Sequence, residues 1–489
     1  MQAKYLLGFD VGTYESKGVI CDFNGGILAK ASSRHVLKSP KPGWAEHDPI
    51  GDWWFDFKTI VRKLLDSAGI NAKEIAAIGV SAIMAAITPV DEDFNPLRNA
   101  ILYGIDTRCM EQAARLNAEI PREKLLAFGG PCTVEHFGPK ILWIRENEPE
   151  VFAKAKMFTV AAGFLTGKLT GVNCTDRYSI KSCVPMIHPQ SFEWDDEMCA
   201  RICPKERMPV VAESTSTVVG CVTAKAAQET GLAEGTPVIC GTTDAGAEAV
   251  SVGVTDVNDV MLMYGSTAFY AAITDRILPN SGSLWCDEYV LDHLYSYTGG
   301  MATTGSLTRW LLDNLAPELV AREKRGEINA YDTLFAEADS IPLGSDGLIC
   351  LPYFQGERMP IQDPLAKGVF FGLSLRHTRG HLVKAVFEGI AYGIDQNFAL
   401  LREAGIPITT VTAVGGGTKT PLWLQVVSDV CGVRQIVPEV TIGASFGDAL
   451  LAGLGIGAIS SPEAIKRMVR IKRVVEPDAA RHAAYAPYK

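Results

Sequence analysis

The sequence predicts a two-domain α/β protein from three observations. The chain has 489 residues, whereas single hydrophobic cores stop growing near roughly 250–300 residues. Strands are expected at 5–9, 18–23 and 27–33, and alternating helix and strand patterns follow them. A similar strand-turn-strand unit at 260–274 suggests a second, related domain, although any β-hairpin has this pattern. We therefore expect domains at 1–250 and 251–489.

Further elements follow in chain order. Asn24-Gly25-Gly26 predicts the hairpin turn between the second and third strands. Apolar residues at helical spacing predict a helix at 49–68, and an apolar run predicts a buried strand at 75–81. Strand-glycine-helix patterns are expected at 236–252 and 409–430, and residues 442–448 open another helix.

Composition excludes several classes of partner. The chain has 46 basic and 56 acidic residues and no long basic run, so nucleic acid is not expected to bind. Twelve scattered cysteines without a Cys-x-x-Cys pair are expected to be reduced and mostly buried. Asp10 comes too early for a signal peptide, and no run of about 18 apolar residues occurs. We expect a cytoplasmic protein without a membrane segment.

A phosphate-binding turn is expected after the first strand. The pattern Asp10-x-Gly12-Thr13-x-x-x-Lys17 puts a carboxylate at a strand end and a tight glycine turn behind it. Backbone N–H groups and the Thr13 hydroxyl could hold a phosphate, while Asp10 positions Mg²⁺ through water. The alternative is an ordinary Asp-Gly hairpin without a chemical role.

Asp244 is the candidate catalytic base. It follows Thr242-Thr243 at the expected start of a helix, where the helix dipole favours an ionised carboxylate. Such a carboxylate can accept a proton from an attacking hydroxyl group. The alternative is that Asp244 only caps the helix.

A long pattern late in the chain is the most specific signal. It runs from Gly368 through Phe370, Gly372 and Leu373 to His381, Leu382, Ala385, Val386, Phe387 and Glu388. Some ten specified positions over about twenty residues are hard to meet by chance. The pattern resembles the signature of the FGGY carbohydrate kinases. This resemblance implies an ATP-dependent sugar or polyol kinase.

The resemblance also implies roles for individual residues. Asp10 would hold Mg²⁺, and Asp244 would be the catalytic base and contact the substrate. Three motifs would bind ATP. The first phosphate loop corresponds to Gly12, Thr13 and Lys17, and the second phosphate loop with its ribose-side neighbour corresponds to Gly265, Ser266, Thr267 and Gly305. The adenosine motif corresponds to Gly416, Gly417 and Thr418.

The expected substrate pocket lies in the N-terminal domain. Met84, Asp106 and Arg108 fall where family members bind sugar, and such side chains suit a polyol. Family members acting on xylulose typically carry Met-His-Gly where this chain has Met84-Ala85-Ala86. A ketopentose such as xylulose is the default substrate; the alternatives are erythritol, glycerol, another ketose or another polyol.

The resemblance implies two ribonuclease-H-like domains of the actin and sugar-kinase type, with ATP and sugar in an interdomain cleft. Family members are often dimers, so a homodimer is expected. Two other classes stay open: a non-catalytic, ATP-gated sugar-binding regulatory protein and a chaperone-like ATPase.

Two further glycine patterns are interpreted as structural, because 163–169 has the wrong spacing for a P-loop and 453–457 ends a helix.

Overall fold

The chain folds into two compact units in the computed structural model, which describes residues 3–278 and 284–489. Within the described residues, unit 1 comprises those of 1–253, 288–292 and 442–468. Unit 2 comprises those of 254–287, 293–441 and 469–489. The chain therefore crosses between the units several times: it returns to unit 1 for the short segment 288–292 and again for 442–468, and its last residues belong to unit 2.

The main sheet of unit 1 has the strand order β11-β12-β5-β1-β2-β3, and β13 also pairs with β5. β1 is antiparallel to β2 and parallel to β5, and β12 is parallel to β5 but antiparallel to β11. The strands are β1 (Tyr5–Val11), β2 (Glu15–Asp22), β3 (Ile27–Arg34), β5 (Ile75–Ala82), β11 (Val218–Cys221), β12 (Pro237–Ile239) and β13 (Thr242–Thr243).

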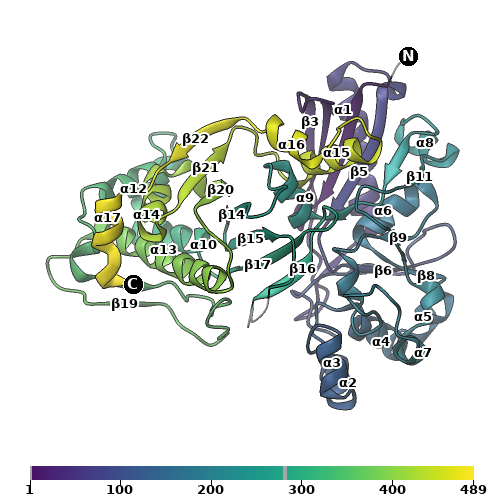
Figure 1. The fold of residues 1–489 in the computed structure, drawn as a ribbon, viewed down its shortest axis with the longest axis horizontal. Helices are drawn as coiled ribbons and strands as arrows, with labels where there is room; N and C mark the ends of the chain where they lie inside the picture. The colour runs from purple at the N-terminus through teal and green to yellow at the C-terminus, as the bar shows by residue number, and fades with distance from the viewer. Residues whose placement is uncertain (1–2, 279–283) are drawn as a thin grey trace. The chain divides into compact units, whose positions relative to one another are not determined.

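Helices cover both faces of this sheet, which explains why nearly all of β1 is buried. Gly18 faces Ile60 of α1 (Phe55–Ala68), whereas Gly8 faces the backbone of α15 (Ala444–Gly455). Gly18 pairs across the ladder with Phe9, the chain neighbour of Gly8. Successive residues of a strand point to opposite faces, so α1 and α15 lie on opposite faces. Figure 1 shows the yellow α15 beside the purple strands.

A second, smaller sheet in unit 1 has the order β4-β7-β6-β8, and β9 pairs with β10. These strands are β4 (Glu46–His47), β6 (Ile87–Val90), β7 (Ala100–Ile101), β8 (Met157–Val160), β9 (Cys174–Thr175) and β10 (Val210–Val211). The other helices of the unit are α2 (Met110–Glu119), α3 (Arg122–Ala127), α4 (Phe137–Asn147), α5 (Pro149–Lys154), α6 (Ala161–Thr170), α7 (Asp196–Ile202), α8 (Ala224–Thr230), α9 (Asp244–Ser251) and α16 (Pro462–Met468).

The large sheet of unit 2 has the order β16-β17-β15-β14-β20-β21-β22. β14 is antiparallel to β15 and parallel to β20, β20 is parallel to β21, and β22 is antiparallel to β21. The parallel and antiparallel pairings along β17-β15-β14-β20-β21-β22 are the same as those along β3-β2-β1-β5-β12-β11 in unit 1. The strands are β14 (Val260–Tyr264), β15 (Ala268–Thr274), β16 (Trp285–Glu288), β17 (Tyr295–Met301), β20 (Thr410–Val414), β21 (Arg434–Pro438) and β22 (Ile471–Val475).

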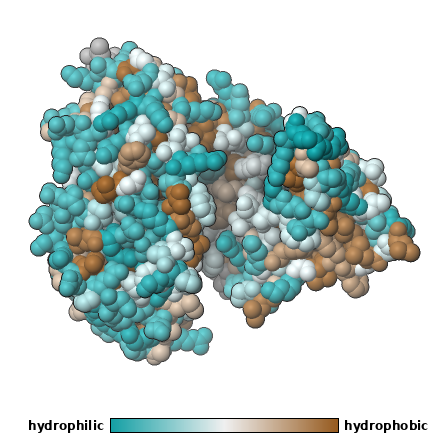
Figure 2. Space-filling view, turned by 180° about the vertical axis from the view of Figure 1, so that it is seen from behind, coloured by the Kyte–Doolittle hydropathy of each residue, from teal (hydrophilic) through white to brown (hydrophobic). Residues whose placement is uncertain are grey.

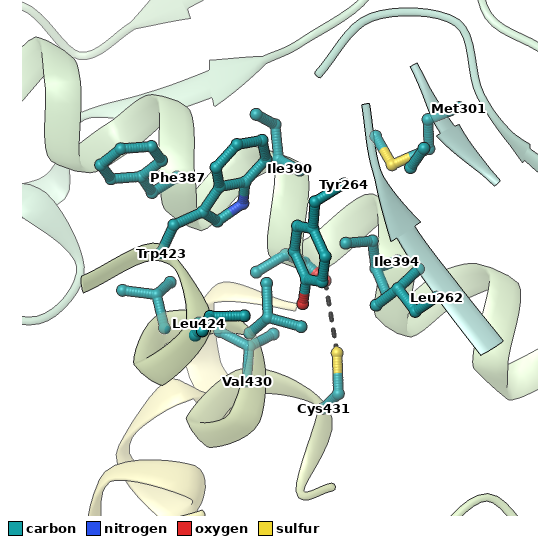
Figure 3. Packing of buried hydrophobic residues seen from close by; sticks show 14 of the residues in the cluster. Leu262, Tyr264, Met301, Phe387, Ile390, Ile394, Trp423, Leu424, Val430 and Cys431 are labelled. Carbon is teal, nitrogen blue, oxygen red and sulfur yellow. Dashed lines mark hydrogen bonds between the residues drawn. The ribbon is translucent and has the colours of Figure 1, made fainter. Parts of the chain in front are cut away.

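A dense apolar core joins the helices of unit 2 to this sheet. Trp423 stacks on Phe387 and meets Tyr264 edge-on, with ring centroids 5.5 Å and 5.3 Å apart; Figure 3 shows the three rings. The long helix α13 carries Phe387, and α14 carries Trp423. The helices are α10 (Gly305–Leu315), α11 (Pro317–Lys324), α12 (Ala330–Asp339), α13 (Arg379–Glu403), α14 (Pro421–Cys431) and α17 (Ala479–Tyr485), and β18 (Ile349–Leu351) pairs with β19 (Val369–Phe371).

The helix predicted at 49–68 forms in two parts. Residues Pro49–Trp54 make a π-helical turn, and α1 begins at Phe55. The side chain of Asp48 explains the first part, because it accepts hydrogen bonds from the N–H groups of Ile50 and Gly51.

The glycine pattern at 163–169 lies inside α6, and 453–457 spans the end of α15, as the structural interpretation expects.

The surface differs between the two units. In Figure 2, hydrophilic side chains cover most of the visible face of unit 1, whereas apolar side chains gather on part of unit 2. Ten of the twelve cysteines are buried. Among the residues that the structure describes, no helix is long and apolar enough to cross a membrane.

Candidate functional site

The predicted phosphate turn lies between β1 and β2 of unit 1. Asp10 is near the end of β1 and pairs with Lys17 of β2 across the ladder. The N–H of Gly12 donates to the carbonyl of Glu15 at 3.0 Å, which closes the turn. The hydroxyl of Thr13 lies 2.9 Å from that of Tyr103. Four residues of the predicted site, namely Asp10, Gly12, Thr13 and Lys17, are thus neighbours in one hairpin.

Asp10 and Asp244 are carboxylates of unit 1 whose charges interact. Burial raises the pKa of Asp10 well above its usual value, and the charge of Asp244 raises it further. Burial likewise raises the pKa of Asp244 to about 6, against hydrogen bonds from backbone N–H groups that lower it. Two carboxylates that influence each other in this way can divide metal binding and proton acceptance between them.

The helix α9 presents Asp244 at its first residue. Thr243, not Asp244, is the N-cap, and its hydroxyl accepts from the N–H of Gly246 at 3.4 Å. The carboxylate of Asp244 accepts from the adjacent Ala245 N–H at 2.7 Å. One turn further along α9, burial and the charge of Asp244 raise the pKa of Glu248. Asp244 is therefore not occupied as the N-cap of this helix.

Asp448 on α15 is another carboxylate beside Asp10, buried like it, that the sequence did not single out. Its Oδ2 lies 2.7 Å from the Ser81 hydroxyl, which also lies 3.1 Å from Oδ1 of Asp10. Burial and the charge of Asp10 raise the pKa of Asp448. The only sequence signal was the helix start predicted at 442–448, which does not say against which sheet the helix packs.

Glycines of the sheet explain why α15 lies close enough for this contact. A Cβ atom on Gly8 would lie 1.8 Å from the carbonyl oxygen of Ser445, and one on Gly79 would lie 2.1 Å from that of Asp448. Both obstacles are backbone atoms, which cannot rotate away. The two glycines therefore let α15 rest directly on β1 and β5.

The predicted sugar-side residues lie in and beside a buried ion-pair network. The carboxylate of Asp106 accepts from Nε and Nη2 of Arg108, at 2.9 Å and 2.6 Å, and from the Ala45 N–H at 2.7 Å. Arg108 also pairs with Glu46 at 2.8 Å and lies 3.9 Å above the ring centre of Trp44. The side chains of Asp106 and Arg108 are fully buried, and Met84 is half-buried.

Three predicted nucleotide segments converge in unit 2 at the end of β14. The N–H of Gly305 and the hydroxyl of Thr304 donate to the carbonyl of Gly265, at 3.0 Å and 3.1 Å. Ser306 donates to the carbonyl of Ser266 through its hydroxyl at 2.9 Å. These bonds join the 265–267 turn, which includes Thr267, to the start of α10.

The glycine turn after β20 is the third of these segments. Gly415 has φ +90°, and a Cβ atom there would lie 2.6 Å from the carbonyl oxygen of Tyr264. The hydroxyl of Thr418 donates to the carbonyl of Gly415 at 2.7 Å and closes the turn. A Cβ atom on Gly417 would meet Trp423 at 2.6 Å, whereas one on Gly416 would meet nothing within 4 Å. This open backbone suits the close approach of a flat ligand.

The described residues contain no group of three or more His, Cys, Asp or Glu side chains that could hold a metal ion by themselves. Mg²⁺ does not need such a group, because it keeps several waters and binds through one or two carboxylates together with substrate phosphates. Asp10, a buried carboxylate beside a glycine turn, fits this mode.

The fold and these sites are those expected of a two-domain α/β kinase, and comparison with known proteins identifies its family. Residues 5–251 match the N-terminal domain of the FGGY family of carbohydrate kinases, and residues 260–456 match the C-terminal domain. The chain belongs to this family and is an ATP-dependent carbohydrate kinase, as the sequence predicted.

Individual relatives are similar over most of their length. The chain is 30% identical to the xylulose kinase of Bacillus subtilis over 468 residues, covering 94% of this chain and 90% of that protein. It is 27% identical to the gluconokinase of the same organism, covering 95% and 90%. The crystal structure of xylulose kinase from Rhodospirillum rubrum superimposes with a TM-score of 0.89 at 31% identity, covering 99% of this chain and 96% of that one. The predicted fold class is confirmed.

Proposed function

We propose that this carbohydrate kinase transfers the γ-phosphate of ATP to a hydroxyl group of a ketopentose of the xylulose type. The observation that carries the reaction is the pair of interacting carboxylates in unit 1, the buried Asp10 and the half-buried Asp244. The substrate class is supported by the relatives named xylulose kinase, which are similar along the whole chain.

In the proposed mechanism Asp244 accepts the proton of the attacking hydroxyl group. The substrate oxygen then forms a bond to the γ-phosphorus, while the bond between that phosphorus and the bridging oxygen of ADP breaks. A base with its pKa near 6 is ionised at neutral pH yet basic enough to take this proton. Asp244 needs no other change of state during transfer.

The phosphates would be held by backbone and hydroxyl groups. We assign Gly12, Thr13 and Lys17 to the first phosphate contact and Asp10 to Mg²⁺, which supplies charge neutralisation on the phosphates when bound. In unit 2 the second phosphate and nucleoside contacts are assigned to Gly265, Ser266, Thr267, Gly305, Gly416, Gly417 and Thr418.

The sugar would be bound by Met84, Asp106 and Arg108 together with Asp244. Asp106 and Arg108 are fully buried and paired with each other in this structure, so the sugar has to reach them through a rearranged or opened loop. The residue after Met84 is alanine, where family members acting on xylulose typically carry histidine. A site that relies on hydrogen bonds to hydroxyl groups discriminates strongly, so this difference bears directly on which substrate is accepted.

ADP release tests the proposal. The purified protein with MgATP is assayed against ketopentoses, aldoses, polyols and aldonic acids, each with a no-sugar blank. The gluconokinase relative motivates the aldonic acids. Strong stimulation by xylulose is the expected result. Stimulation by gluconate or a polyol instead would replace the substrate, and ADP release independent of every sugar would reject the proposal.

The oligomeric state and the cellular location of the protein are proposals as well. A homodimer is tested by light scattering coupled to size-exclusion chromatography, in which a mass of 52.8 kDa would indicate a monomer. A cytoplasmic location is tested by cell fractionation.

A further inference from the structure

Two buried histidines hold the two carbonyl groups of the predicted phosphate turn. Nε2 of His35 lies 3.0 Å from the carbonyl oxygen of Gly12, and Nε2 of His47 lies 3.0 Å from that of Thr13. The rings meet edge-on with centroids 4.8 Å apart. The side chain of His35 is 3% exposed, and His47 is completely buried. Both bonds are therefore shielded from bulk solvent.

The partners of His47 determine its protonation. The indole N–H of Trp53 lies 3.0 Å from Nδ1 of His47. An indole nitrogen can only donate, so Nδ1 must accept and carries no proton. The proton of the neutral ring is then on Nε2, where it is donated to Thr13. Burial and the neighbouring His35 lower the pKa of His47 to about 4, which agrees with a neutral ring.

The partners of His35 require the opposite state. Nδ1 of His35 lies 2.9 Å from the carboxylate of Asp56, which is itself 2% exposed, and Nε2 faces the Gly12 carbonyl. A carbonyl and an ionised carboxylate can only accept, so beside the charged Asp56 both ring nitrogens must donate, and only the imidazolium does so. The Ser16 hydroxyl lies 3.5 Å from the same Nδ1 and can accept as well.

The charges around His35 agree with this assignment. Burial lowers the pKa of His35, but the hydrogen bond and charge of Asp56, the Gly12 carbonyl and the charge of Asp52 raise it above the usual value. His47 is the other titratable group that faces His35, and Lys38 acts on His47. Loss of the His35 proton would leave either Asp56 or the Gly12 carbonyl without its donor.

The geometry of the peptide bond carries these contacts to the ligand side of the turn. In a planar trans peptide the C=O of one residue and the N–H of the next point in opposite directions. Fixing the carbonyl of Gly12 therefore fixes the N–H of Thr13, and fixing that of Thr13 fixes the N–H of Tyr14. Both N–H groups point away from the histidines.

We propose that His35 and His47 are positioning residues that hold the N–H groups of Thr13 and Tyr14 toward the phosphates of ATP. Their roles differ: His47 acts as a fixed neutral tautomer, and His35 acts only while protonated. The inference rests on the proposed role of the Gly12 and Thr13 turn. It predicts that the KM for ATP rises as the pH rises through the pKa of His35.

Glutamine substitutions separate the two roles. A glutamine side chain has one donor end and one acceptor end. At position 47 it can donate to Thr13 and accept from Trp53, so His47→Gln should keep the KM for ATP close to the wild-type value. At position 35 its acceptor end would face Asp56, so His35→Gln should fail to replace histidine. Adding Asp56→Asn to His35→Gln supplies a donor and should restore part of the loss.

The measurements are the KM for ATP, the KM for the sugar and kcat over pH 6–9, ADP binding by calorimetry, and thermal unfolding. Losing one oriented hydrogen bond of this kind should raise the KM for ATP about tenfold in His47→Leu and His35→Gln. The KM for the sugar should stay unchanged. In His35→Gln the KM for ATP should no longer depend on pH in this range. His188→Gln, a change to a half-exposed histidine paired with Asp195, is the matched control.

The outcomes separate this inference from the proposed function. Folded His47→Leu and His35→Gln proteins with wild-type KM for ATP and wild-type ADP affinity would overturn the inference, as would equal changes in the KM for ATP and the KM for sugar. If His47→Leu does not fold, the contrast between the two glutamine variants decides. If the wild-type protein shows no sugar-dependent ADP release, the proposed function fails, and ADP affinity still tests the histidines.

Discussion

The hydroxyl oxygen of Ser81 lies 2.7 Å from the carboxylate oxygen Oδ2 of Asp448, a residue 367 positions later in the chain. The same hydroxyl lies 3.1 Å from Oδ1 of Asp10. A serine hydroxyl has one proton and cannot donate to two ionised carboxylates at once. One of the two acids must therefore carry a proton, and Asp448, which is 1% exposed, is the more deeply buried.

We predict that Asp448→Asn and Asp448→Ala differ strongly in stability. An asparagine amide is neutral and can still donate to Ser81, so the free energy of unfolding should change by less than about 1 kcal/mol. Alanine removes the partner of Ser81 in a buried place and should lower it by about 1–3 kcal/mol. Urea denaturation of both variants checks this. Equal losses in the two variants would contradict a protonated Asp448.

Asp448 should also make stability depend on pH. Its pKa in the folded protein is raised above the ordinary value of 3.8. The folded state then binds a proton that the unfolded state releases, so this group lowers stability as pH rises from about 4 toward the folded-state pKa. Asp448→Asn should remove this decline. Denaturation midpoints of the wild type and the variant at pH 4–8 give the comparison, and parallel curves would count against it.

The close approach of α15 to the sheet gives a third prediction. Gly8→Ala and Gly79→Ala would each push a Cβ atom into a backbone carbonyl of α15, at 1.8 Å and 2.1 Å. Overpacking of this kind typically costs about 1–3 kcal/mol or more. Gly18→Ala is the matched control, because its Cβ would meet the Ile60 and Leu64 side chains, which can rotate. Thermal unfolding should rank Gly18→Ala as the mildest of the three.

Local patterns in the sequence were sufficient for most strands and turns but not for the contacts between distant segments. The strand predicted at 5–9 corresponds to β1, and the helix that ends the strand-glycine-helix pattern predicted at 236–252 corresponds to α9, with small shifts of their ends. The return of 442–468 to unit 1 depends on the fit of α15 against Gly8 and Gly79. That fit exists only in three dimensions, so Asp448 could not be found from its own neighbourhood.

Sequence patterns indicated residue types at the site but not which side chains pair with one another. Asp106 and Arg108 were expected to bind sugar because their chemistry suits a polyol, but spacing alone did not indicate that the two side chains pair with each other. The same holds for His35 and His47. Each is a single histidine beside a short strand, and only the folded protein brings them to the carbonyls of Gly12 and Thr13.

Lys140 on α4 provides a prediction at alkaline pH. Its ammonium group is completely buried and donates to the carbonyl of Ala85 at 2.7 Å. Burial lowers its pKa to about 8, against an ordinary value of 10.5. Between these values the unfolded state binds more protons than the folded state, so this group increases stability as pH rises. Lys140→Met should lose that increase from pH 8 to 10, and the exposed Lys225→Met should keep it.

The role of Asp244 is tested most directly by pairing two changes on α9. Asp244→Asn removes the proposed base and should lower kcat by about 10²–10⁴-fold, while calorimetry should show ADP binding largely intact. Glu248→Gln removes the carboxylate one turn away and should retain most of the turnover, because Glu248 has no assigned part in proton transfer. A comparable loss in both variants would indicate a general electrostatic effect of the acidic pair instead of a specific base.

The pH dependence gives the same assignment an independent check. A base must be unprotonated to accept a proton, and the pKa of Asp244 is about 6. The wild-type kcat/KM should therefore fall below about pH 6, with a slope of one proton, and stay level above it until other groups titrate. Because asparagine does not titrate, the residual activity of Asp244→Asn should lose this acid limb. An unchanged limb in the variant would assign the titration, and with it the base, to a different group.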